Sequence, residues 1–113
     1  MRTKFILLIV FSFFSNFKLT AQAINDFQSH QSGNWNQTST WERWNGTAWI
    51  TPAPFTPTSS EGSITILNSH IVSVSAAVSA DQLVINTGGQ ITTNPGIALS
   101  VVNGSGDDLT ING

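Results

Sequence analysis

Three short apolar runs of this chain each end in an asparagine: SITILN (63–68), QLVIN (82–86) and LSVVN (99–103). Their asparagines follow one another at intervals of 18 and 17 residues. In the first run apolar and polar residues alternate, and this period of two is typical of a β-strand. A run that returns at a nearly constant interval indicates copies of one structural unit that stack on each other.

A second set of runs falls between the first: IVSVS (71–75), QITTN (90–94) and DLTIN (108–112). Within this set, Asn94 and Asn112 are again 18 residues apart. The two sets together predict a repeat of about 18 residues with two short strands in each copy.

Two all-β folds can use these strands: an antiparallel sandwich of hairpins, in which asparagine is simply a common turn residue, and a parallel solenoid. Stacked coils place equivalent residues about 4.8 Å apart, whereas hairpins need no equivalence between copies. Asparagine suits a stacked row because it tolerates left-handed backbone and its amide can hydrogen-bond to the amide of the next coil. We therefore expect a right-handed parallel β-solenoid of about three short coils, with a structural ladder of Asn68, Asn86 and Asn103. Asn94 and Asn112 are expected to form a shorter second ladder.

The segment WERWNGTAWI (41–50) predicts a β-hairpin. Its Asn-Gly pair suits a type I′ turn, whose two central residues need positive φ. A two-residue loop of this kind pairs Trp44 with Thr47 and places Trp44 and Trp49 on one face, because side chains alternate across a strand. The end of a solenoid exposes unpaired edges and an open core. We therefore interpret the hairpin as an N-terminal cap, joined to the coils by a proline-rich link.

The N-terminus has the pattern of an export signal. Arg2 and Lys4 precede an apolar run of 13 residues, FILLIVFSFFSNF (5–17), and AQA (21–23) fits the small-x-small cleavage rule. The run is shorter than the roughly 20 residues that a membrane-spanning helix needs. We therefore expect a cleaved signal peptide over residues 1–23, a secreted or cell-surface location, and no stable membrane insertion after cleavage.

Two further regions follow the signal peptide. Residues 24–62 are expected to form a Trp-rich N-terminal segment with the hairpin cap and the proline-rich link, and residues 63–113 to form the solenoid coils. A mature chain this small, without a cysteine to form a disulfide, is marginal as an independent core. Because the coil pattern still runs at Asn112, we expect the coils to continue into downstream repeats of a longer parent chain.

Charged residues make up only 9% of the chain, and the formal net charge is −2. A typical soluble protein has about 25% charged residues, and the missing basic field argues against nucleic acid as a partner. The chain has no cysteine and two histidines, so a zinc site is hard to build. The segment NGSGDD (103–108) matches a calcium-binding Gly/Asp turn only in part, and we interpret it as a coil corner. We expect no cofactor and no metal.

No catalytic constellation stands out in the sequence. Glu42, Glu61 and Asp81 are isolated from one another, so no pair of acids has the spacing of a glycosidase site. Neither His30 nor His70 stands in a Ser/His/Asp order with a nucleophile elbow. The sequence therefore predicts a protein that is not an enzyme in itself.

A family resemblance is carried by SGNW (32–35), the tryptophan hairpin, the proline-rich link, SITILNSHIVSV (63–74) and ADQLVINTGGQI (80–91). In these segments the chain resembles the N-terminal part of large secreted or surface proteins of Bacteroidetes. Such proteins begin with a signal peptide and a Trp-rich start and continue into a β-helix, and many end in a sorting domain for type IX secretion. The same pattern is similar to the start of G8-type domains. The resemblance spans residues 32–113 and implies an architecture rather than an activity.

These features predict a secreted or cell-surface structural or adhesion module. Its expected partners are extracellular polysaccharide or cell-surface components, together with the downstream repeats. An alternative is a carbohydrate-binding module in which Trp44 and Trp49 stack on a sugar ring; the competing interpretation is that the tryptophans close the open end of the core. A further alternative is the N-terminal part of a polysaccharide-active β-helix enzyme whose site lies outside residues 1–113.

Overall fold

The computed structural model of the protein describes residues 22–104 and 106–112. Within them the chain is all-β, as the sequence predicts, apart from one short 3-10 turn, η1 (Thr38–Thr40). The predicted signal peptide lies outside the described residues except for residues 22 and 23. In chain order the strands are β1 (Phe27–Ser29), β2 (Gly33–Asn34), β3 (Trp41–Trp44), β4 (Trp49–Ile50), β5 (Ser63–Ile66), β6 (Ile71–Val74), β7 (Val78–Ala80), β8 (Gln82–Ile85), β9 (Gln90–Thr93), β10 (Leu99–Val101) and β11 (Leu109–Ile111).

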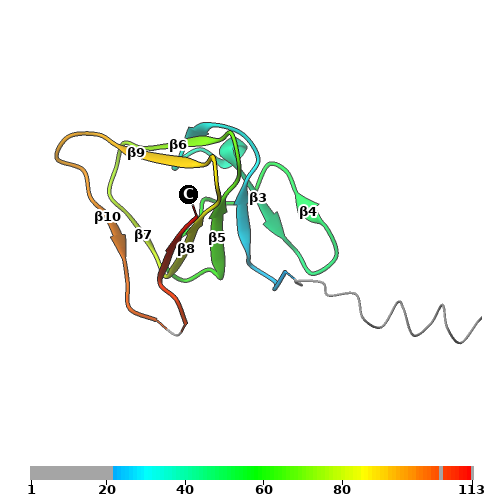
Figure 1. Ribbon diagram of the computed structural model, residues 1–113. Helices are drawn as coiled ribbons and strands as arrows, with labels where there is room; N and C mark the ends of the chain where they lie inside the picture. The colour runs from blue at the N-terminus through cyan, green and yellow to red at the C-terminus, as the bar shows by residue number, and fades with distance from the viewer. Residues whose placement is uncertain (1–21, 105, 113) are drawn as a thin grey trace, which may run out of the picture.

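The strands of the described residues form three sheets (Figure 1). A six-stranded sheet has the order β11-β8-β5-β1-β3-β4, a three-stranded sheet has the order β2-β6-β9, and a two-stranded sheet pairs β7 with β10. The pairs β1–β3 and β3–β4 are antiparallel, so the largest sheet is mixed. The other strand pairs are parallel.

The chain visits the three sheets in a repeating order. Strands β5, β6 and β7 each lie in a different sheet, and β8, β9 and β10 return to the same sheets in the same sequence. In Figure 1 the pairs β5–β8, β6–β9 and β7–β10 lie on three sides of a common interior. We call each such passage a circuit. Strands β1 and β2 belong to an earlier circuit and β11 to a later one, because β1 and β11 flank β5 and β8 in the six-stranded sheet.

The core fills the interior of these circuits. In β5, Ile64 and Ile66 are fully buried and Thr65 between them is only half-buried. In β6, Val72 and Val74 are fully buried in the same alternating pattern. This alternation follows from the period of two in a strand, and each buried aliphatic side chain contributes about 1.5–3 kcal/mol through removal of its apolar surface from water.

Stacking begins earlier in the chain than the sequence pattern indicates. The first strand that pairs in parallel is β1, where Phe27 lies beside Ile64, rather than a strand that starts at residue 63. Phe27 is buried and continues the apolar row formed by Ile64 and Leu83. The sequence does not predict this strand, because a single apolar residue between Asp26 and Gln28 shows no alternation.

The order of the last two strands corrects the predicted repeat. The run 99–103 was expected to stack on the run 82–86, but β10 pairs with β7, and it is β11 that pairs with β8. A circuit therefore contains three strands rather than two. The third strand, β7, lies in an alanine- and serine-rich run with weak strand character. Equivalent residues are consequently 19 apart between Ile66 and Ile85 and 26 apart between Ile85 and Ile111.

The N-terminal end of the core is covered by two tryptophans and the proline-rich link. Trp35 and Trp41 are fully buried, with ring centroids 5.0 Å apart and rings inclined at 71°. The Trp41 indole donates a hydrogen bond to the Trp35 carbonyl at 2.9 Å, and the Trp35 indole donates to the Pro57 carbonyl at 3.0 Å. Ala53 is also buried, and its N–H donates to the Trp41 carbonyl at 3.0 Å. The link is therefore part of the cover, not only a connection.

The tryptophan hairpin forms with a register that differs from the expected one. Trp44 pairs with Trp49 instead of Thr47, and the loop has four residues, 45–48. The Asn45 side-chain oxygen accepts hydrogen bonds from the N–H groups of Thr47 and Ala48 at 2.8 and 2.9 Å. This local turn replaces the two-residue turn, since an asparagine side chain readily caps the backbone that follows it. The shift keeps Trp44 and Trp49 on one face.

If the interior alternation holds the fold together, two isoleucines should differ sharply in their contribution. Ile64→Ala leaves a cavity at a fully buried position and should lower the free energy of unfolding by about 2–5 kcal/mol. Ile71→Ala is the matched control, because Ile71 is 45% exposed, and should cost less than about 1 kcal/mol. Urea unfolding followed by circular dichroism measures both. Should Ile64→Ala prevent folding, Ile64→Val should still show a loss of about 0.5–1.5 kcal/mol. Equal losses at the two positions would contradict this core.

Candidate functional site

The two tryptophans that the sequence offers for sugar binding lie on the outer face of the six-stranded sheet. Trp44 in β3 and Trp49 in β4 are opposite one another and half-buried. Their ring centroids are 5.4 Å apart and the rings are inclined at 62°, an edge-to-face contact. They are not coplanar, so they do not form one flat platform, and they do not lie in the buried cover formed by Trp35 and Trp41.

A groove on the same face contains one of these two tryptophans. It has a volume of about 300 Å³. Its lining residues come from the N-terminal segment, β1, β4 and β5 and are Gln22, Asp26, Phe27, Gln28, Trp49, Ser63 and Thr65. Trp44 does not line it. The groove therefore separates the two candidate tryptophans: Trp49 belongs to a concave site, and Trp44 supports Trp49 from the side.

The carboxylate of Asp26 fixes one part of this groove. One of its oxygens accepts a hydrogen bond from the Ser63 N–H at 3.0 Å, and the other accepts from the Ala23 N–H at 2.9 Å. The carboxylate thus ties the segment before β1 to the start of β5. Ser63 and Thr65 present their hydroxyls outward because Ile64 and Ile66 point into the core. In the described part of the chain, neither of these two hydroxyls has a hydrogen-bond partner.

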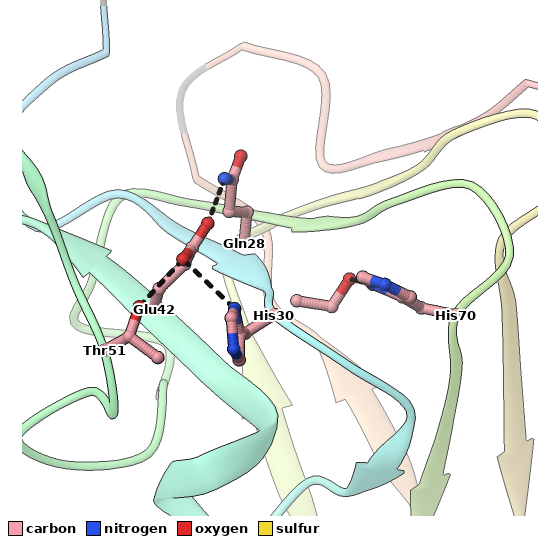
Figure 2. Close-up of polar contacts among 6 residues, drawn as sticks. Gln28, His30, Glu42, Thr51 and His70 are labelled. Atoms are coloured by element: carbon pink, nitrogen blue, oxygen red, sulfur yellow. Dashed lines mark hydrogen bonds and ion pairs between the residues drawn. The ribbon is translucent and has the colours of Figure 1, made fainter.

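Gln28 is held in place by a polar network on the same face, shown in Figure 2. The Gln28 amide donates a hydrogen bond to the Glu42 carboxylate on the neighbouring strand β3. The same carboxylate accepts from the Thr51 hydroxyl at 2.9 Å and lies 3.4 Å from Nδ1 of His30. His30 is 47% exposed, so its contact with Glu42 adds little to stability. The main effect of the network is to fix the orientation of Gln28.

Ser29 and His70 also lie close together, but their geometry is structural. The Ser29 hydroxyl lies 2.7 Å from Nδ1 of His70. A nucleophilic serine needs a histidine at this distance, but it also needs contact with substrate. Ser29 is fully buried, and its hydroxyl accepts a hydrogen bond from the Leu67 N–H at 2.9 Å. The pair therefore holds the corner after β5.

The predicted asparagine ladder is replaced by a different row. The Asn86 N–H donates to the Ile66 carbonyl and the Asn112 N–H donates to the Ile85 carbonyl, each at 2.9 Å, so these two asparagines hold equivalent positions in successive circuits. Asn103 follows β10, which pairs with β7, and so does not continue the row of Asn86. Asn94 likewise follows β9, in the three-stranded sheet, and is not in a row with Asn112.

Asn68 has a separate role at the corner between β5 and β6. A Cβ atom at Gly88 in the next circuit would lie 1.9 Å from the Asn68 side-chain oxygen, so the asparagine packs directly on this glycine. Ser69 and Gly88 both have left-handed backbone, with φ of 72° and 86°. The Ser69 N–H donates to the Gly88 carbonyl at 3.0 Å. The two corners thus stack, one on the other.

No metal or membrane-spanning feature is found in the described part of the chain. Among residues 22–104 and 106–112, no three His, Cys, Asp or Glu residues come together as metal ligands. In the segment 103–108, of which residue 105 lies outside the described residues, the Gly104 N–H donates to Asp108 at 3.1 Å. No helix within the same described ranges has the length and apolar character to cross a bilayer.

The chain was compared with family models, curated proteins and solved structures. No family model, no curated protein and no solved structure matches this chain. Gln28, Ser63 and Thr65 were not identified as site residues from the sequence. The alternation in SITI (63–66) could have indicated that Ser63 and Thr65 point outward. It could not have placed them beside Trp49, since that requires the pairing of β5 with β1.

The stacked corners predict responses of different size at two equivalent positions, Gly88 and Ser69. Gly88→Ala introduces a side chain at positive φ and against Asn68, and should lower the free energy of unfolding by about 1–3 kcal/mol. Ser69→Gly removes a non-glycine residue from the same backbone conformation and should change stability by less than about 1 kcal/mol, in either direction. The urea midpoints of the two variants, at an unchanged slope, give the comparison. A harmless Gly88→Ala would show that the corners do not stack in this way.

Proposed function

We propose that this chain is a secreted or cell-surface structural or adhesion module, built as a right-handed parallel β-solenoid and non-catalytic in itself. The observation that carries the proposal is the in-register parallel pairing of consecutive circuits in three sheets. A scaffold of this kind presents flat, regular outer faces, on which binding residues can be placed without disturbing the interior. The right-handed sense is supported by the strong preference of parallel β-connections for that hand.

The two ends of the stack support a module that is extended in one direction. The N-terminal end is covered by Trp35, Trp41 and the proline-rich link. At the opposite end, β9, β10 and β11 are edge strands of their sheets, and Leu109 and Ile111 are 49% and 65% exposed. These edge strands contain no charged residue or proline, the usual devices that block an edge. We propose that further coils, as downstream repeats of a longer chain, pair with this end.

Export and surface location are supported by the charged start, apolar run and small-x-small site of residues 1–23. The low charge of the chain, with a net charge of −2, suits contact with extracellular polysaccharide or cell-surface components better than contact with nucleic acid. The resemblance to secreted Bacteroidetes proteins, with type IX secretion, points to the same location.

Carbohydrate binding is a second candidate, which the groove beside Trp49 favours. No observation favours the third candidate, the N-terminal part of a polysaccharide-active enzyme. The Ser29–His70 pair gives it no support, since the serine hydroxyl is fully buried.

The proposal predicts that the full chain is exported, processed and adhesive. Expressed in a Gram-negative host, it should leave the cytoplasm and begin at Gln22 or Ile24, which mass spectrometry of the purified protein determines. Beads that carry the processed protein should attach to glass coated with extracellular polysaccharide. The control for export is Leu8→Arg, which interrupts the apolar run and should keep the chain in the cytoplasm. The control for attachment is Ile64→Asp, which places an unpaired charge in the core.

The two readouts contradict different parts of the proposal. A wild-type chain that stays in the cytoplasm with residues 1–23 intact would contradict secretion. Exported protein whose beads attach no better than beads carrying Ile64→Asp would contradict an adhesive role.

A further inference from the structure

We infer that the groove beside Trp49 binds one ring of a neutral sugar chain, with the hydroxyls of Ser63 and Thr65 and the amide of Gln28 as its polar contacts. The inference rests on the proposed function, because it names the ligand class that an adhesive outer face would hold. It also differs from the binding mode expected from the sequence, in which Trp44 and Trp49 together form the platform.

The chemistry of the lining suits a sugar. A sugar ring has apolar C–H faces and a rim of hydroxyls, so it needs an aromatic surface on one side and donors and acceptors around it. Trp49 supplies the aromatic surface from β4. Ser63 and Thr65 supply hydroxyls from β5 that can both donate and accept. Within the described residues these two hydroxyls make no hydrogen bond, so a ligand can bind them in place of water.

The charges around the groove favour a neutral ligand. The groove is lined by no lysine or arginine, and its one charged side chain is Asp26. Arg43, the only lysine or arginine among residues 22–104 and 106–112, is placed elsewhere: its guanidinium lies over the Phe55 ring, 5.4 Å from the centroid, and donates to Asn25. A phosphate or a uronic acid would therefore meet the Asp26 carboxylate and no lysine or arginine side chain. Neutral sugars avoid this repulsion.

The groove is formed before a ligand arrives. Asp26 ties the segment before β1 to β5, and Glu42 fixes the Gln28 amide from the neighbouring strand (Figure 2). Trp49 is packed edge-to-face against Trp44, which restricts its ring. Binding to fixed groups loses less conformational entropy than binding to mobile ones. The volume of about 300 Å³ is at the lower end of ligand sites, and this suits a single ring rather than a long segment.

Retention of the processed chain on insoluble cellulose, xylan and mannan tests the site, with polygalacturonate as the anionic probe. We expect retention on at least one neutral polysaccharide and none on polygalacturonate. Trp49→Ala should weaken retention about tenfold or more, since it removes the aromatic surface. Thr65→Val keeps the shape of the side chain and removes its hydroxyl, and should weaken retention about threefold to tenfold.

Two matched controls separate binding from folding. Ile50→Ala changes the neighbouring residue of β4, which is 40% exposed and does not line the groove, so its retention should stay within about threefold of wild type. Thr92→Val makes the same change as Thr65→Val, but at an exposed threonine of the three-stranded sheet. It should leave retention on the polysaccharide unchanged. Circular dichroism shows whether Trp49→Ala folds. If it does not, the comparison of retention between Thr65→Val and Thr92→Val alone tests the sugar site.

Three results would overturn the inference: no retention on any neutral polysaccharide, retention on polygalacturonate alone, or equal losses for Thr65→Val and Thr92→Val. These failures are distinct from failure of the proposed function. Beads that carry Trp49→Ala and still attach as well as wild type would leave the adhesive role standing and overturn the groove as its site. Retention of the wild-type chain on a neutral polysaccharide, without any attachment of its beads, would support the groove as a sugar site and overturn the adhesive role.

Discussion

The parallel pairing of β5 with β8 is the constraint on which the other features of the structure depend. It places Ile64 beside Leu83 and Ile66 beside Ile85, so that each apolar side chain in one circuit covers its equivalent in the next. The same register brings Ser69 and Gly88 together at the corner. A slip of one residue would turn every interior side chain toward solvent, because side chains alternate along a strand. The outward position of Ser63 and Thr65 has the same cause.

The core is covered at its N-terminal end, whereas the strands at the opposite end have free edges. At the N-terminal end, Trp35 and Trp41 bury large apolar surfaces, and both indole N–H groups find backbone carbonyls. Burial of an indole without such a partner would carry the cost of an unpaired donor. At the other end, β9, β10 and β11 are edge strands without charges. None of the residues of these three edge strands lines the groove beside Trp49.

Local patterns in the sequence predicted where the strands lie better than which strands pair with one another. The runs 63–66, 71–74, 82–85 and 90–93 were predicted as strands and have the expected neighbours, since alternation and turn residues are local signals. The run ending at Asn103 was placed on the wrong neighbour because nearly every strand here ends in a polar corner, and an asparagine does not distinguish one corner from another. The groove itself was not predicted: Trp49 alone among its lining residues was a candidate for sugar binding, because the other walls come from strands that meet only in the folded chain.

Disulfide trapping tests the three-strand circuit most directly, in a chain that has no cysteine of its own. Val84 lies beside Thr110 in the structure, whereas the two-strand repeat expected from the sequence places Val84 beside Val101. Neighbouring strands are about 4.8 Å apart, within the range that a disulfide spans. If a circuit has three strands, the variant with Val84→Cys and Thr110→Cys should form an intramolecular disulfide under mild oxidation, and the variant with Val84→Cys and Val101→Cys should not. A disulfide in the second variant and none in the first would contradict the three-strand circuit.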